Sequence, residues 1–125
     1  MSFALWAILA AAVLPYLCAA AAKYGGPGYD NARPRPSLAG LSGWRQRADW
    51  AQRNHFEAFP PFAAGVLTAE FVHAPQGLVD GLAAGFILVR LVYTAAYIAD
   101  RPTLRSLLFG VGFAFVIGLF CGGLR

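Results

Sequence analysis

Four apolar segments follow one another along the chain, at about residues 2–22, 47–73, 78–99 and 103–123. A helix rises ~1.5 Å per residue, so a segment of about 20 residues can cross the ~30 Å hydrocarbon core of a bilayer. The second segment differs from the others because its first half is polar and only residues 62–72 are mainly apolar. The pattern predicts an all-α membrane protein in which residues 1–125 form one domain, a bundle of four transmembrane helices.

The connections between these segments differ in charge. Residues 23–53, which include a loop at 23–46 rich in glycine and proline, carry Lys23, Arg33, Arg35, Arg45, Arg47 and Arg53. The turn between the third and fourth segments adds Arg101 and Arg105, whereas the turn at residues 73–77 has no lysine or arginine. Because basic connections remain on the cytoplasmic side, loops 1–2 and 3–4 are predicted to be cytoplasmic and both termini to lie outside.

Composition supports a membrane location and excludes other classes. Hydrophobic residues make up 58% of the chain and charged residues 13%, against about 25% charged in soluble domains. The net charge of +4 comes from residues that flank apolar segments, so it indicates topology and not nucleic-acid binding. His55 and His73 are too far apart on one helix to share a metal ion, and Cys18 and Cys121 are expected near opposite membrane faces, unpaired. We therefore predict an integral membrane protein whose partner is the lipid bilayer, with no metal site and no nucleic acid.

The polar half of the second segment places one set of side chains on one helical face. Arg47, Trp50, Asn54 and Glu57 are spaced by three, four and three residues. A carboxylate and an amide at this depth are costly unless they meet partners inside the bundle. The face is therefore either part of a functional site or a polar clamp that only joins helices.

The third segment has a matching stripe. Arg90, Tyr93, Tyr97 and Arg101 are spaced by three, four and four residues, and Arg105 continues the stripe. Arg90 lies about ten residues, or ~15 Å, inside the cytoplasmic end, so it needs a partner, and Glu57 is the predicted counter-charge. We expect a polar pocket that suits a small anionic ligand with amides and carboxylates; the alternative is an internal salt-bridge network without a ligand. The predicted lining residues are Asn54, Glu57, Arg90, Tyr93, Tyr97 and Arg105.

Small residues indicate where helices approach closely. Gly81 and Gly85 in the third segment and Gly118 and Gly122 in the fourth form two G-xxx-G patterns. Such patterns permit close backbone contact, either within one chain or between protomers.

Two motifs together carry a resemblance to a known family. The first is Gln52-Arg53-Asn54-His55-Phe56-Glu57 followed by Phe59-Pro60; the second is Arg90-x-x-Tyr93-x-x-x-Tyr97-x-x-x-Arg101-Pro102-x-x-Arg105-Ser106. With four segments and a long first loop, the whole chain resembles the MAPEG family, the membrane-associated proteins in eicosanoid and glutathione metabolism. Residues 59–64 are similar to the bacterial branch, which implies a bacterial inner membrane.

The resemblance implies a homotrimer of four-helix bundles that binds glutathione as a co-substrate between protomers, near the cytoplasmic face. It further implies a glutathione-dependent transferase or peroxidase acting on lipophilic electrophiles or hydroperoxides that enter from the bilayer. Arg105 matches the arginine near the glutathione sulfur, and Ser106 the serine beside it. The remaining matches to glutathione contacts are Gln52, Asn54, Glu57, Arg90, Tyr93 and Tyr97.

Two positions depart from the family pattern. Trp50 occupies the place of an arginine that binds glutathione in many members, and Ala58 replaces an aromatic or similar residue that follows the glutamate in some. Loss of a charge-assisted contact to a carboxylate costs about 1.5–3 kcal/mol of binding, although Arg47 or Arg53 could compensate. The alternative function is therefore a non-catalytic membrane subunit or structural partner, including one in a larger membrane complex, that retains the fold. A transporter is disfavoured because no inverted repeat is evident.

Overall fold

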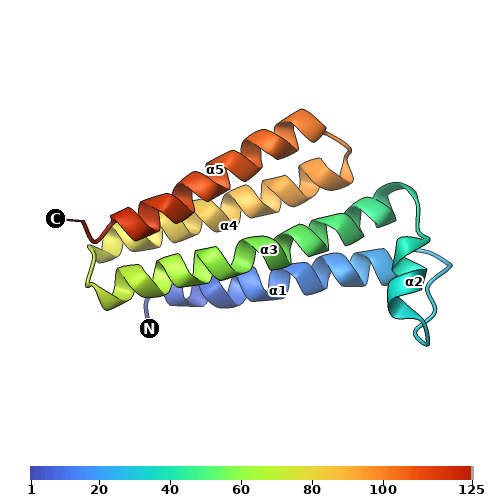
Figure 1. The fold of residues 1–125 in the computed structure, drawn as a ribbon, viewed down its shortest axis with the longest axis horizontal. Helices are drawn as coiled ribbons and strands as arrows, with labels where there is room; N and C mark the ends of the chain where they lie inside the picture. The colour runs from blue at the N-terminus through green and yellow to red at the C-terminus, as the bar shows by residue number, and fades with distance from the viewer. Residues whose placement is uncertain (125) are drawn as a thin grey trace.

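The computed structural model describes residues 1–124. Its helices are α1 (Phe3–Tyr24), α2 (Pro34–Ala39), α3 (Gly43–Phe71), α4 (Gln76–Ile98) and α5 (Pro102–Cys121). The four long helices run side by side, with α1 next to α3 and α4 next to α5 (Figure 1). Both chain ends and the α3–α4 turn lie at one end of the bundle, and α2 and the α4–α5 turn lie at the other. The predicted all-α architecture with four long helices is confirmed.

Two local features differ from the sequence expectation. The loop at residues 23–46 contains the short helix α2, and α3 begins at Gly43, four residues before the predicted start of the second segment. α3 also continues through Pro60 and Pro61, although each proline removes one intrahelical N–H donor. Packing against three other long helices holds this irregular segment in a helix.

Three helices, α1, α4 and α5, are long and apolar enough to cross a membrane. α3 does not meet the same measure of apolar composition, because its first half carries charged and polar side chains. Two of these, Asp49 and His55, are only 3% exposed and therefore face the interior of the bundle. The polarity of α3 thus points toward other helices, as expected for an intramembrane helix that contributes to a site.

The core is centred on aromatic stacking between α3 and α4. The rings of Phe62 and Phe86 are parallel to within 7°, with centroids 4.0 Å apart. Phe62, Val66, Val79 and Leu119 are fully or almost fully buried around this stack. On α1, small residues face the same core, namely Ala4, Ala7 and Ala11. Their size lets α1 approach α3 closely.

Hydrogen bonds fasten the end of the bundle that holds the chain termini. The amide group of Gln76 donates to Glu70 at 3.2 Å and to Asp80 at 2.9 Å. Asp80 also accepts from the backbone N–H of Ala4 at 2.9 Å, and the Ser2 hydroxyl donates to Glu70. At the start of α1, the N–H group of Ala4 is therefore satisfied by a side chain of α4, and that of Leu5 by the side chain of the N-cap residue Ser2.

At the opposite end, one arginine closes the first loop. The Arg45 guanidinium donates to the carbonyl oxygens of Ala22 at 2.9 Å and Lys23 at 3.1 Å, and also to that of Pro27. A cation at the C-terminal end of α1 satisfies its open carbonyl groups and complements the helix dipole. Both cysteines are free; Cys18 is buried, whereas Cys121 is exposed and not the buried residue that its apolar segment suggests.

Glycines allow α4 and α5 to pack closely within one chain. A Cβ atom at Gly85 would lie 2.7 Å from the Phe115 ring, and one at Gly118 would lie 3.3 Å from Leu82. A Cβ atom at Gly81, by contrast, would meet no atom of the described residues within 4 Å. The predicted close approach is therefore confirmed for α4 and α5, and Gly85 makes the tightest contact of the three.

We predict that Gly85→Val lowers the free energy of unfolding by about 1–3 kcal/mol, because the added side chain must displace the Phe115 ring. The matched control is Gly81→Val, which makes the same change one turn earlier in α4 where space is open. Thermal unfolding in detergent micelles measures both variants. Equal losses of stability in the two variants would contradict this account of α4–α5 packing.

Candidate functional site

The site is built around Arg90, which projects from α4 toward α3 and is only 3% exposed. Its Nη2 atom donates to Asn54 Oδ1 at 2.8 Å and lies 2.8 Å from His55 Nδ1, to which Nε also donates at 3.2 Å. The guanidinium carbon lies 4.1 Å from the centre of the Tyr93 ring, within the range of a cation–π contact. Two neighbouring residues of α3 therefore position a cation that belongs to α4.

These contacts determine the protonation state of His55. A nitrogen that accepts from a guanidinium cannot carry a proton, so Nδ1 is bare and the proton lies on Nε2. Nε2–H then donates to Thr94 Oγ1 at 2.8 Å, and the Thr94 hydroxyl donates to the backbone carbonyl of Arg90 at 2.8 Å. His55 is therefore a neutral imidazole that connects the Arg90 side chain to the backbone of the same residue.

The predicted Glu57–Arg90 ion pair is not formed. Among residues 1–124 the single ion pair joins Arg53 to Asp49 at 3.2 Å. Glu57 is exposed, whereas Asn54 and His55 lie on the part of α3 that reaches the guanidinium. Neutral acceptors thus take the place that the sequence assigned to a carboxylate, because the side of α3 that faces α4 is set by packing and not by the charge pattern.

Five of the eight predicted site residues line one pocket of about 340 Å³ beside α5. Within it, the Arg105 guanidinium lies 4.6 Å from the centre of the Tyr97 ring, and the Tyr93 and Tyr97 rings meet edge to face with centroids 5.7 Å apart. We call this the polar pocket. It is lined by Asn54, Tyr93, Tyr97, Arg105, Ser106 and Phe109.

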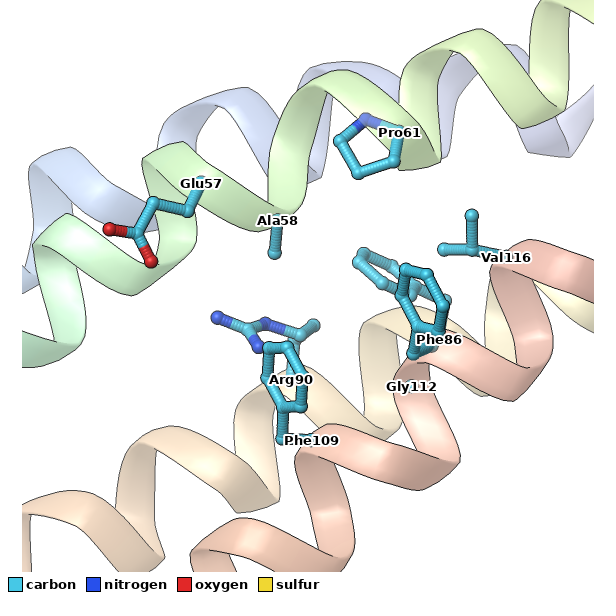
Figure 2. Close-up of a pocket in the computed structure, with 9 residues that line it drawn as sticks. Glu57, Ala58, Pro61, Phe86, Arg90, Phe109, Gly112 and Val116 are labelled. Atoms are coloured by element: carbon cyan, nitrogen blue, oxygen red, sulfur yellow. The ribbon is translucent and has the colours of Figure 1, made fainter.

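A second, smaller cavity of about 100 Å³ lies deeper in the bundle (Figure 2). It contains two further predicted residues, Glu57 and Arg90, but its walls are otherwise apolar. We call this the apolar cavity. Phe109 lines both it and the polar pocket.

The eighth predicted residue, Gln52, lies in neither space. Its side-chain oxygen is buried and makes no hydrogen bond within residues 1–124. Trp50, at the position of the missing family arginine, is 42% exposed. Arg47 donates from Nε to the carbonyl oxygen of Ile98 at 2.9 Å, and Arg53 pairs with Asp49, so both arginines already have partners.

Sequence reasoning missed two residues of this network, His55 and Thr94. The signal was present, because His55 adjoins the predicted Asn54 and Thr94 lies one helical turn beyond Arg90. Neither residue carries a negative charge, so the expectation of a counter-charge for Arg90 pointed to Glu57 and not to these two.

The fold and the site together define an integral membrane bundle of four long helices, with a buried arginine and a polar pocket at one end. The chain belongs to the MAPEG family, whose family model matches residues 3–125. This is a family of proteins with four transmembrane helices, most of whose members are glutathione-dependent transferases or peroxidases. No curated protein and no solved structure matches the chain.

We predict that His55→Phe destabilises the protein by about 1.5–3 kcal/mol, because it removes an acceptor from a buried guanidinium. Chemical denaturation in detergent measures the loss. In the double variant His55→Phe/Arg90→Met, the cost should be clearly smaller than the sum of the two single changes, since the residues act as one unit. Strict additivity would show that the two side chains are not coupled.

Thr94→Val should lower the free energy of unfolding less than His55→Phe does, because it leaves both acceptors of Arg90 in place.

Proposed function

We propose that the protein is a glutathione-dependent transferase or peroxidase that acts on lipophilic electrophiles or hydroperoxides. The observation that carries the proposal is the polar pocket, which brings Arg105 and Ser106 of α5 together with Asn54, Tyr93 and Tyr97. These residues come from three helices and were matched to glutathione contacts by their motifs alone. Membership of the MAPEG family supports the same ligand.

The size and chemistry of the pocket suit this co-substrate. A volume of about 340 Å³ falls in the range of small-molecule sites, about 300–1,000 Å³. Glutathione offers carboxylates and amides, and the pocket offers a guanidinium, two phenols, a hydroxyl and a side-chain amide. Glu57 and Gln52, which lie outside this pocket, are proposed to contact the part of glutathione that extends beyond it.

Arg105 is proposed to stabilise the reactive form of the thiol. A free thiol has a pKa near ~8.5 and is mostly protonated at neutral pH. A guanidinium beside the sulfur favours the thiolate, which is the nucleophile, and each tenfold gain in thiolate corresponds to ~1.4 kcal/mol. The Ser106 hydroxyl, on the same turn of α5, can donate a hydrogen bond to the sulfur.

Two reactions are open to a thiolate at this position. In conjugation, the sulfur bonds to the electrophilic carbon, and a leaving group departs with its electron pair. In peroxide reduction, the sulfur takes the distal oxygen, the O–O bond breaks, and the alkoxide is protonated to an alcohol. The sulfenic acid then reacts with a second glutathione to give the disulfide and water.

We further propose a homotrimer with glutathione bound between protomers and the pocket end of the bundle on the cytoplasmic side of a bacterial inner membrane. Both basic connections, between α1 and α3 and between α4 and α5, lie at this end (Figure 1). This arrangement agrees with the positive-inside rule.

A second function, a non-catalytic membrane subunit or structural partner, is favoured by one observation. Trp50 stands where many family members have an arginine for glutathione, and its side chain is 42% exposed. The arginines nearest in sequence are already bonded elsewhere, Arg47 to Ile98 and Arg53 to Asp49. Glutathione affinity therefore decides between the two functions.

We predict that purified protein binds glutathione saturably and produces the ultraviolet absorbance of a thiolate. Arg105→Ala should abolish the thiolate signal at neutral pH, because the sulfur loses its cation. Arg101→Ala is the matched control, since Arg101 lies one turn earlier but outside the polar pocket. Absence of binding at millimolar glutathione would contradict the transferase proposal and favour the non-catalytic subunit.

We also predict that Trp50→Arg tightens glutathione binding by about 10- to 100-fold, the equivalent of one charge-assisted hydrogen bond. Calorimetry in detergent micelles measures the change. Trp50→Gln is the control, because it removes the indole without adding charge and should leave the affinity unchanged. An unchanged affinity in Trp50→Arg would show that this position does not face bound glutathione.

A further inference from the structure

The connection between α1 and α3 carries more positive charge than its own contacts use. Residues 23–45 include four basic side chains and a single acidic one. The Lys23 ammonium lies 5.2 Å from the centre of a tyrosine ring, and the Arg45 guanidinium donates to three backbone carbonyl groups. The other two cations, Arg33 and Arg35, are exposed and make no ion pair within the part of the chain that the structure describes. The connection therefore presents two guanidinium groups that are free to bind an anion.

Hydrogen bonds hold the segment that carries these two arginines in one shape. The N–H of Ala32 donates to the Asp30 carboxylate at 2.9 Å, and the N–H of Arg33 donates to the Asp30 carbonyl oxygen at 3.0 Å. The N–H of Asp30 in turn donates to the hydroxyl of Ser37, on α2, at 3.1 Å. The carboxylate of Asp30 is thus used to order the backbone, and a ligand would meet a backbone that is already ordered, which lowers the entropic cost of binding.

Packing places α2 at the level where α1 ends. Leu38 of α2 and Leu41 form a small apolar cluster with Ala22 of α1 and Ala48 of α3. Ala22 lies ~29 Å along α1 from its first residue, Phe3, and the hydrocarbon core of a bilayer is ~30 Å thick. α2 also runs across the direction of the long helices, beside the end of α1 (Figure 1). In a bundle that spans the membrane, α2 therefore lies along the surface, at the level of the lipid headgroups.

Aromatic side chains occur at the same level. Tyr24, the last residue of α1, and Trp44, in the first turn of α3, are both exposed. Tyr24 also meets Tyr29 edge to face, with ring centroids 6.0 Å apart. Exposed tyrosine and tryptophan are typical of the membrane–water interface, because each combines an apolar ring with a polar group. The connection thus combines interfacial aromatic residues with free cations.

The chemistry of this surface fits a phosphate group at the edge of a membrane. A guanidinium can donate two parallel hydrogen bonds to phosphate oxygens. Basic residues next to the end of a transmembrane helix favour anionic lipids, at ~1 kcal/mol for each lysine or arginine near the surface. Two free arginines are few for a nucleic acid, since proteins that bind DNA typically neutralise about 6–10 phosphates.

We propose that the α1–α3 connection is a binding site for the headgroup of an anionic phospholipid. Arg33 and Arg35 bind the phosphate, Tyr24 and Trp44 lie at the glycerol level, and the acyl chains extend beside the bundle. This inference goes beyond the proposed glutathione-dependent function and does not depend on it. The four residues line neither the polar pocket nor the apolar cavity.

Phosphatidylglycerol and phosphatidylcholine with identical acyl chains test the proposal, because both contain a phosphate and only the first has a net negative charge. Each lipid is titrated into the full-length protein in dodecylmaltoside micelles, and native mass spectrometry measures the bound fraction. The wild-type protein should bind phosphatidylglycerol about fivefold more tightly, or better. Equal binding of the two lipids would overturn the proposal.

Variants locate the site. Arg35→Gln should weaken phosphatidylglycerol binding by about fivefold, the effect of one cation at a lipid surface. Arg101→Gln is the matched control, because it removes the same charge from an exposed position on the α4–α5 turn at the same end of the bundle. It should leave the affinity at the wild-type level. An equal loss in both variants would show that net charge alone attracts the lipid and would overturn the assignment to this connection.

Two further comparisons separate charge from loop shape and lipid from free phosphate. Arg35→Lys keeps the charge and should bind phosphatidylglycerol more tightly than Arg35→Gln does; equal weakening in the two would overturn the role given to the cation. Millimolar inorganic phosphate, added at constant ionic strength, should leave the lipid bound, because the aromatic residues and the acyl chains contribute to its affinity. Displacement of the lipid by phosphate would assign the arginines to a soluble anion and overturn the lipid assignment.

Discussion

The buried guanidinium of Arg90 is the constraint on which the arrangement of α3 and α4 depends. A cation that is 3% exposed inside an apolar bundle must be held by acceptors, and here they are the uncharged side chains of Asn54 and His55. His55 is fixed as a neutral tautomer by the same contacts and bonds onward to Thr94. The two helices are thereby locked in register at the level of the site.

Because Asn54 and His55 are uncharged, the positive charge of Arg90 has no carboxylate partner. An arginine paired to Glu57 would be largely neutralised, whereas one held by neutral acceptors keeps its charge and one free nitrogen for a ligand. The polar pocket and the apolar cavity adjoin this residue and share Phe109.

α3 shows how a polar helix is accommodated in such a bundle. Most of its charged and polar residues occupy the half near the basic loops, and its more apolar half carries Phe62 and Val66 into the core. The helix continues through Pro60 and Pro61 because its neighbours hold it, and Pro61 contributes to the wall of the apolar cavity. Pro60 and Pro61 therefore lie at the border between the polar site and the core.

The sequence by itself determined the four long helices, the free cysteines, the family and the stripe Arg90–Tyr93–Tyr97, because helical periodicity and apolar segment length are local properties. It also indicated that Asn54, Tyr93, Tyr97, Arg105 and Ser106 share a site, and the structure brings them to one pocket. Only the tertiary structure decided which acceptor Arg90 uses. Glu57 and His55 are both within reach in sequence, and the rotation of α3 against α4, set by the stacking of Phe62 on Phe86 and by close helix packing, directs His55 inward and leaves Glu57 exposed.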